Sequence, residues 1–270
     1  MTTALLLTCL FLSPLAAAPP ATGEPSNAVE AAAKKAEADK LLDERYAAWV
    51  STLAPEQQAW ERVLQENLGS FYLPIHKQEK VAGRSNAWDF VPDDPRLPRV
   101  LLIGDSVSRG YTQSVRKTLA GRANVHRAPA NCGPTSMGLQ KLDVWLGAGK
   151  WDVIHFNFGI HDRNTPVAEY RQRLEQLVDR LKKTGAKLIW ASTTPIPDDP
   201  AKQQTAASIV ERNEAAAQIM EKHGVATDDL FTAVTPHLET MQNPHDVHFN
   251  AAGYEFLGQQ VGQAIEARLK

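Results

Sequence analysis

A serine stands where the chain could place a nucleophile. Ser106 ends the sequence Gly104-Asp105-Ser106, which follows the apolar run at residues 99–104 and precedes a predicted helix. Backbone N–H groups at the N-terminus of a helix carry partial positive charge, which favours the oxyanion formed when a serine attacks a carbonyl. An ordinary N-cap serine occupies the same kind of position. The motif by itself is therefore open to both interpretations.

A cluster of ionisable residues near the C-terminus could activate this serine. The sequence NPHDVHFN at residues 243–250 holds His245, Asp246 and His248 directly before a predicted final helix. A histidine on this loop could take the proton of Ser106, and a neighbouring carboxylate could fix the tautomer of the imidazole. Helix capping, with Asn250 as the N-cap, is the structural alternative.

The same residues also permit a metal-dependent hydrolase. His245, Asp246 and His248 could supply nitrogen and oxygen ligands together with His161 and Asp162. A His-x-x-His pair on a loop is weak evidence for a metal site. The serine-based interpretation requires no metal and no organic cofactor, so we expect neither.

Two further polar segments follow predicted strands. Residues 131–138 (NCGPTSMG) contain Gly133, whose missing side chain would let a backbone N–H approach a ligand. A plain turn is the alternative there. Residues 157–162 (NFGIHD) could direct a polar side chain into the same crevice. His155 and Asn157 alternate with apolar residues along the preceding run, so we interpret both as satisfied polar groups of the core.

The elements around these segments alternate between short apolar runs and amphipathic helices. Strands are predicted at residues 99–104, 124–128, 151–159, 187–193 and 225–231. Helices are predicted at residues 107–120, 137–147, 167–184, 205–223 and 251–269. This alternation predicts an α/β fold whose parallel sheet is covered on both faces. Because ligands of such sheets bind at the carboxyl ends of the strands, the polar segments should meet there.

Four polar segments in the order Ser, Gly, His, Asp/His, each at an element boundary, resemble the SGNH (GDSL-type) hydrolase family over residues 98–269. The resemblance implies a flavodoxin-like three-layer α/β/α sandwich with a five-stranded parallel sheet. It also implies that Ser106 is the nucleophile. The backbone N–H groups of Ser106 and Gly133 would then bind the oxyanion.

Two segments depart from the family pattern. The third usually reads Gly-x-Asn-Asp, whereas this chain has His161 in place of the asparagine. A neutral imidazole retains one N–H, so His161 can replace the amide as an oxyanion donor. The last segment usually reads Asp-x-x-His, whereas Asp246 stands two residues before His248. We assign His248 as the base and Asp246 as its orienting acid. The alternative is a Ser-His dyad supported by a backbone carbonyl.

The resemblance implies a serine esterase that works through an acyl-enzyme. We expect O-acyl esters as substrates, O-acetyl esters of carbohydrates above all. A short-chain lipid esterase, a lysophospholipase or a thioesterase would use the same groups. A sugar-binding module that has lost its chemistry is the alternative from another class, motivated by the two altered segments.

Charged and aromatic residues near these segments are candidate substrate contacts. Asp105, Asp162 and Arg163 adjoin the first and third segments. Arg109 and Arg163 could bind an acidic sugar or lie as solvated charges at helix ends. Five aromatic residues could stack on sugar rings or pack the N-terminal part of the chain against the rest: Trp60, Phe71, Tyr72, Trp88 and Phe90.

Composition excludes several classes of protein. The chain has 270 residues and a formal net charge of −2, so it has no broad electrostatic attraction for nucleic acid. With 43% hydrophobic and 22% charged residues, it is neither a disordered tail nor a membrane bundle. Two cysteines, Cys9 and Cys132, exclude a disulfide scaffold and a cysteine-based zinc site.

The N-terminus predicts export. Residues 4–17 form an apolar run followed by small residues, too short to span a bilayer and typical of a signal peptide. An apolar N-terminal helix is the alternative. We divide the chain into a signal peptide at 1–23, a helical extension with a long loop at 24–97, and a hydrolase domain at 98–270. The mature protein would be secreted or periplasmic, with no other segment of membrane-spanning length.

Overall fold

The computed structural model describes residues 27–269. The predicted signal peptide and Cys9 lie outside the described residues. The chain divides into two compact units, residues 1–41 and 42–270, and helix α1 (Asn27–Ser51) belongs to both. The described residues of the first unit are exposed, and their helix carries the ion pairs Lys34–Glu30 and Lys35–Asp39 four residues apart.

In the second unit, helices α2 (Pro55–Asn67) and α3 (Gly69–Val81) precede the sheet in the chain. Helix α2 begins with a proline, which is favoured at the first position of a helix. Helix α3 shortens the long loop that we expected within residues 24–97. The helix forms despite Pro74 because it packs Tyr72 and Leu73 against the buried Leu64 and Trp88. Residues 82–98 are irregular, as expected.

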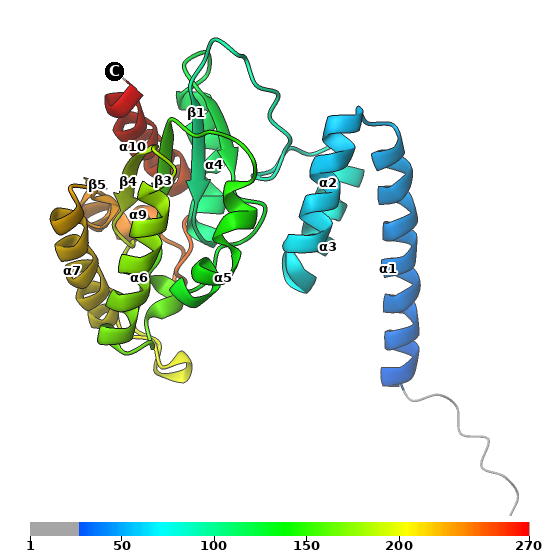
Figure 1. Ribbon diagram of the computed structural model, residues 1–270. Coiled ribbons are helices and arrows are strands. Elements are labelled where there is room, and N and C mark those ends of the chain that lie inside the picture. Colours follow the sequence, from blue (N-terminus) through cyan, green and yellow to red (C-terminus); the bar gives the residue numbers. More distant parts are fainter. Residues whose placement is uncertain (1–26, 270) are drawn as a thin grey trace, which may run out of the picture. The chain divides into compact units, whose positions relative to one another are not determined.

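The centre of the second unit is a five-stranded parallel sheet (Figure 1). Its strands are β1 (Arg99–Ile103), β2 (Asn124–Arg127), β3 (Val153–Phe156), β4 (Lys187–Ala191) and β5 (Ala226–Asp228). The spatial order β2-β1-β3-β4-β5 is the flavodoxin-like order, in which the chain changes direction between β1 and β3. Ligands bind at such a switch point, and Ser106 follows β1.

Helices cover both faces of this sheet (Figure 1). One face carries α5 (Thr135–Leu146), α6 (Val167–Lys182) and α7 (Ala206–His223). The other carries α4 (Ser106–Thr118), α8 (Leu230–Val234) and α10 (Ala251–Leu269). Successive residues of β1 serve different faces: Leu101 joins the first core and Leu102 the second. The structure therefore confirms the predicted three-layer sandwich.

Short elements complete the connections after the strands. These are the single turns η1 (Ile160–Asp162), η2 (Pro200–Lys202) and η3 (Thr235–His237), and helix α9 (Leu238–Met241). Each of the ten predicted strands and helices of the sandwich is present. No helix in residues 27–269 is both long and apolar enough to cross a membrane.

Candidate active site

Ser106 is the first residue of helix α4, at the carboxyl end of β1. The N-cap is Asp105, whose carboxylate accepts a hydrogen bond from the Val107 N–H at 2.9 Å. The serine hydroxyl is therefore not used for capping. Asp105 is 4% exposed, so the structure corrects our expectation that its carboxylate contacts substrate.

Three predicted residues form a hydrogen-bonded chain. The Ser106 Oγ lies 2.8 Å from His248 Nε2, and His248 Nδ1 lies 2.8 Å from Asp246 Oδ1. With the proton on Nδ1, the imidazole donates to the carboxylate and can accept from the serine hydroxyl. This is the arrangement of nucleophile, base and orienting acid. Asp246 faces the imidazole, as the triad interpretation requires.

A tight loop between α9 and α10 holds the histidine. Gln242 and Phe249 form a bridge across the loop, and the Asn243 N–H donates to the His248 carbonyl at 2.9 Å. His245 has a φ of 55°, a left-handed conformation that turns the chain before Asp246. His245 itself is exposed. The turn brings Asp246 back toward His248 although only one residue separates them.

The electrostatics of the triad favour an ionised acid. Burial raises the pKa of Asp246, but hydrogen bonds from the ring and the backbone N–H of His248 outweigh it and leave the pKa below its ordinary value. The side chains of Asp246 and His248 are 46% and 37% exposed. The acid and base are therefore open to solvent, whereas Ser106 is only 9% exposed.

Two backbone donors near the serine have no acceptor. Among the described residues, neither the Ser106 nor the Gly133 N–H donates a hydrogen bond within the protein. The Cys132 N–H donates to the Gly104 carbonyl at 3.1 Å, which joins the second polar segment to the end of β1. Gly133 thus follows a residue that is anchored two residues before Ser106, at Gly104. Burial raises the pKa of the Cys132 thiol to about 12, so this cysteine is a packed, unreactive residue.

The third polar segment divides into structural and exposed residues. The Asn157 amide donates to Ala191 O at 2.8 Å and Thr193 Oγ1 at 3.0 Å, and His155 pairs with Asp228 at 2.9 Å. Both are satisfied core groups, as expected. His161 is exposed on η1 and makes no hydrogen bond to another described residue.

Asp162 has a structural contact instead of the expected substrate contact. It is fully buried, and its carboxylate accepts from the Thr135 N–H at 2.8 Å and the Thr135 hydroxyl at 2.7 Å. This corrects our expectation for Asp162. The carboxylate ties η1, which carries His161, to the start of α5 just after Gly133. It therefore fixes the second and third segments relative to each other.

Arg163 is likewise used within its own turn. One guanidinium nitrogen donates to the Ile160 carbonyl at 3.0 Å. The side chain lines an open depression with α7 residues such as Ser208 and Arg212, in which no triad residue takes part. The structure therefore does not bring Arg163 to the triad, and its contact with substrate stays a prediction.

Sequence reasoning missed Arg127, a buried residue of β2. Its guanidinium donates to the carbonyls of Gly104 and Asp105, both at 2.9 Å, and to the Ser108 hydroxyl. These residues flank Ser106 on both sides. Its position follows from the strand register, which pairs Arg127 with Leu102. Because Leu102 faces α4, the side chain of Arg127 lies on the same face of the sheet.

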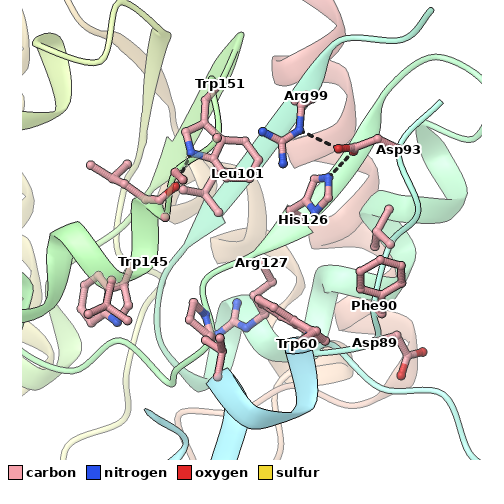
Figure 2. Close-up of a pocket in the computed structure, with 18 residues that line it drawn as sticks. Trp60, Asp89, Phe90, Asp93, Arg99, Leu101, His126, Arg127, Trp145 and Trp151 are labelled. Carbon is pink, nitrogen blue, oxygen red and sulfur yellow. Dashed lines mark hydrogen bonds and ion pairs between the residues drawn. The ribbon is translucent and has the colours of Figure 1, made fainter. Parts of the chain in front are cut away.

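A partly open cavity of about 340 Å³ is lined by residues of β2, among them His126 and Arg127 (Figure 2). Trp60, Trp145 and Trp151 line it, and Asp93 pairs there with Arg99 and His126. No triad residue borders this cavity. Among the other candidate stacking residues, Phe90 lines the cavity, Trp88 is fully buried, and Phe71 is 70% exposed.

The alternative of a metal site has no geometric support in the part of the chain that the structure describes. Within residues 27–269, no three His, Cys, Asp or Glu side chains come together as metal ligands would. His245, Asp246 and His248 do not converge on one point with His161 and Asp162.

Comparison with known proteins places the sandwich among esterases. The model of the GDSL-like lipase/acylhydrolase family matches residues 102–256, more than half of the chain. A lipase/acylhydrolase from Enterococcus faecalis is 26% identical with a TM-score of 0.57, over 64% of this chain and 98% of that one. An acetylxylan esterase from Geobacillus stearothermophilus is 17% identical with a TM-score of 0.53, over 64% and 94%. No curated protein matches the sequence.

Proposed function

The chain belongs to the GDSL-like lipase/acylhydrolase family of ester hydrolases, and on this premise we propose that it cleaves O-acyl esters with Ser106 as the nucleophile. The observation that carries the proposal is the unbroken hydrogen-bonded chain from Ser106 through His248 to Asp246.

The reaction proceeds in two acyl-transfer steps. His248 Nε2 takes the proton of Ser106 as its Oγ attacks the ester carbonyl, and the Asp246 carboxylate stabilises the imidazolium that forms. The N–H groups of Ser106 and Gly133 and the His161 side chain donate to the oxyanion. His248 then protonates the leaving alcohol. A water molecule, activated by the same histidine, releases the acid from the acyl-enzyme.

We propose that the acyl group is small and that acetyl is preferred. The partly open cavity lined by Trp60, Trp145 and Trp151, which could hold a long acyl chain, has no triad residue in its wall. The triad histidine and aspartate are instead partly exposed, so a bulky alcohol such as a polysaccharide can approach them. The fold is shared with acetylxylan esterases, which agrees with a carbohydrate ester as substrate.

We also propose that the enzyme works outside the cytoplasm. Residues 4–17 have the length and composition of a signal peptide. Residues 98–270 would then form the hydrolase domain of the mature protein, and residues 24–97 its N-terminal extension. Detection of the mature N-terminus in the culture medium or periplasm would support this.

Acetate release tests the activity directly. Purified protein and its Ser106→Ala variant are assayed with 4-nitrophenyl acetate and acetylated polysaccharides, and circular dichroism checks that both are folded. We expect the variant to lose at least about 10³-fold in kcat. Equal activity in folded Ser106→Ala would refute the mechanism. Faster cleavage of medium-length acyl esters would favour a lipid esterase or thioesterase, and polysaccharide binding without any turnover would favour a sugar-binding module.

A further inference from the structure

Arg109 lies on the same face of α4 as the nucleophile. It follows Ser106 by three residues, a spacing that places two side chains side by side on a helix. Because helical side chains tilt toward the N-terminus, that of Arg109 leans toward the turn that carries Ser106. Arg109 therefore lies one helical turn after Ser106, on the same side of α4.

This charge has no anionic partner. The guanidinium makes no hydrogen bond or ion pair with any residue in the described part of the chain, and its Nε is enclosed without a partner. Other arginines of this region are satisfied: Arg116 donates to three backbone carbonyls, and Arg122 pairs with Glu266. A partly buried, unpaired guanidinium has lost hydration that an anionic ligand could replace.

Aromatic rings of the N-terminal extension hold the guanidinium in place. Its centre lies 5.5 Å from the ring centroid of Tyr72 on α3 and 5.9 Å from that of Trp88. Both distances are within the range of cation–π attraction. The free charge is thus held in position before any ligand binds.

The loop that carries His248 continues into α10, which packs against α4. Tyr254, in the first turn of α10, covers the α-carbon of Gly110 so closely that an added methyl group would lie 2.1 Å from its ring. Burial raises the pKa of Tyr254, and the charges of both Arg109 and Asp246 act on it.

We propose that Arg109 binds an oxyanionic group of the substrate, a carboxylate or a sulfate, so that the enzyme acts on O-acyl esters of acidic carbohydrates. The inference rests on the proposed esterase function. It also assigns a role to the N-terminal extension, which completes a substrate subsite through Tyr72 and Trp88. The planar guanidinium suits carboxylate and sulfate equally, and its terminal nitrogens have no competing acceptor.

A matched pair of substrates tests the effect of the substrate's carboxylate charge alone. Acetylated oligogalacturonides with free carboxylates are compared with the same oligosaccharides after methyl esterification, so that the sugar and the acetyl group are unchanged. We expect kcat/KM to be about 10- to 100-fold higher for the charged form, the worth of one charge-assisted hydrogen bond. The preference should fall as salt is added. Acetylated oligosaccharides that carry sulfate instead of carboxylate distinguish the two anions.

Variants then assign the preference to Arg109. Arg109→Gln should bring the kcat/KM values for the charged and the neutral substrate to equality, mainly through a change in KM. Tyr72→Leu should reduce the preference for the charged substrate. Arg122→Gln removes the same charge from the turn that follows α4 and should leave the ratio of kcat/KM values unchanged. Thermal unfolding checks that each variant is folded. An undiminished ratio in Arg109→Gln, or no preference in the wild type, would overturn the inference.

Failure of the inference can be separated from failure of the proposed function. If the wild type cleaves both forms equally and Ser106→Ala cleaves neither, the esterase assignment stands and the anion subsite is refuted. If no ester is cleaved in a Ser106-dependent manner, the proposed function itself is refuted.

Discussion

One carboxylate oxygen of Asp246 serves two hydrogen-bond donors of His248. Oδ1 lies 2.8 Å from the ring Nδ1 and 3.2 Å from the backbone nitrogen of the same residue. Bonding to the N–H two residues further on is typical of aspartate in turns, and it needs the short Asp-x-His spacing. The departure from the family spacing thus preserves the orientation of the imidazole.

Asp246→Asn should slow catalysis while leaving the loop in place. The amide oxygen can still accept the His248 backbone N–H, but an amide cannot stabilise an imidazolium as a carboxylate does. We expect kcat/KM for 4-nitrophenyl acetate to fall about 10²- to 10⁴-fold, with little change in melting temperature. His245→Asn is the matched control, since asparagine tolerates the left-handed backbone, and it should change the rate less than about twofold. A wild-type rate in Asp246→Asn would instead support a Ser-His dyad.

His161 should act as an oxyanion donor. It is exposed and unpartnered in the described part of the chain, so its ring is available to substrate. Removal of one oxyanion donor costs about 10²- to 10³-fold in kcat, and we expect this loss in His161→Ala with KM nearly unchanged. His161→Asn restores the usual amide and should recover the rate to within about tenfold of the wild type. If His161→Ala turns over at the wild-type rate, the donor must be sought elsewhere.

The sequence was most informative where local patterns determine structure. The strands and helices of the sandwich follow from apolar periodicity. The order of four polar segments singled out Ser106, Asp246 and His248, which the structure joins by hydrogen bonds. Helix α3 was missed because its sequence has no clear apolar periodicity and contains Pro74. Its stability comes from contacts with α2 and Trp88, which outweigh the cost of the proline.

Side-chain roles were harder to predict, because they depend on register and burial. Asp105 and Asp162 adjoin functional segments in sequence, yet one caps α4 and the other binds Thr135 inside the protein. Arg127 is 21 residues from Ser106 in the chain and comes beside it only through the pairing of β2 with β1. No local pattern marks such a residue.

Arg127 should be a positioning residue for the nucleophile. Lysine in its place keeps the charge but cannot donate to two carbonyls and a hydroxyl with a rigid fork. Since displacement of a reacting group by about 1 Å can cost about 10²-fold, we expect Arg127→Lys to lower kcat by about that factor while KM stays nearly constant. Steady-state kinetics with 4-nitrophenyl acetate and acetylated oligosaccharides would measure the effects on kcat and on KM separately.

Arg116→Lys is the control for Arg127→Lys. Arg116 is another largely buried arginine, whose guanidinium binds the carbonyls of Val125, Asn86 and Asp89 but not the serine turn. Burial lowers its pKa to about 10. This variant should lower the melting temperature without lowering kcat. Equal losses of kcat in both variants would mean that Arg127 acts only through general stability.

Asp89 should make the stability of the N-terminal extension depend on pH. Its carboxylate accepts hydrogen bonds from Lys80 and from the Asn86 N–H, beside Trp88. Burial raises the pKa of Asp89, but these hydrogen bonds outweigh it and hold the pKa below the ordinary value of 3.8. Because the folded pKa is depressed, the stabilisation is fully present above this ordinary value, which applies to the unfolded chain, and is lost as the pH falls through the folded pKa.

Asp89→Asn should therefore destabilise the protein at neutral pH and not in strong acid. We expect a loss of about 1 kcal/mol at pH 7, equivalent to about 2–4 °C in melting temperature. The melting curves of variant and wild type should converge as the pH falls below about 3. Glu214→Gln, which removes an exposed carboxylate on α7, should follow the wild type throughout. A difference that stays constant down to pH 2 would show that ionisation of Asp89 is not what stabilises the segment carrying Trp88.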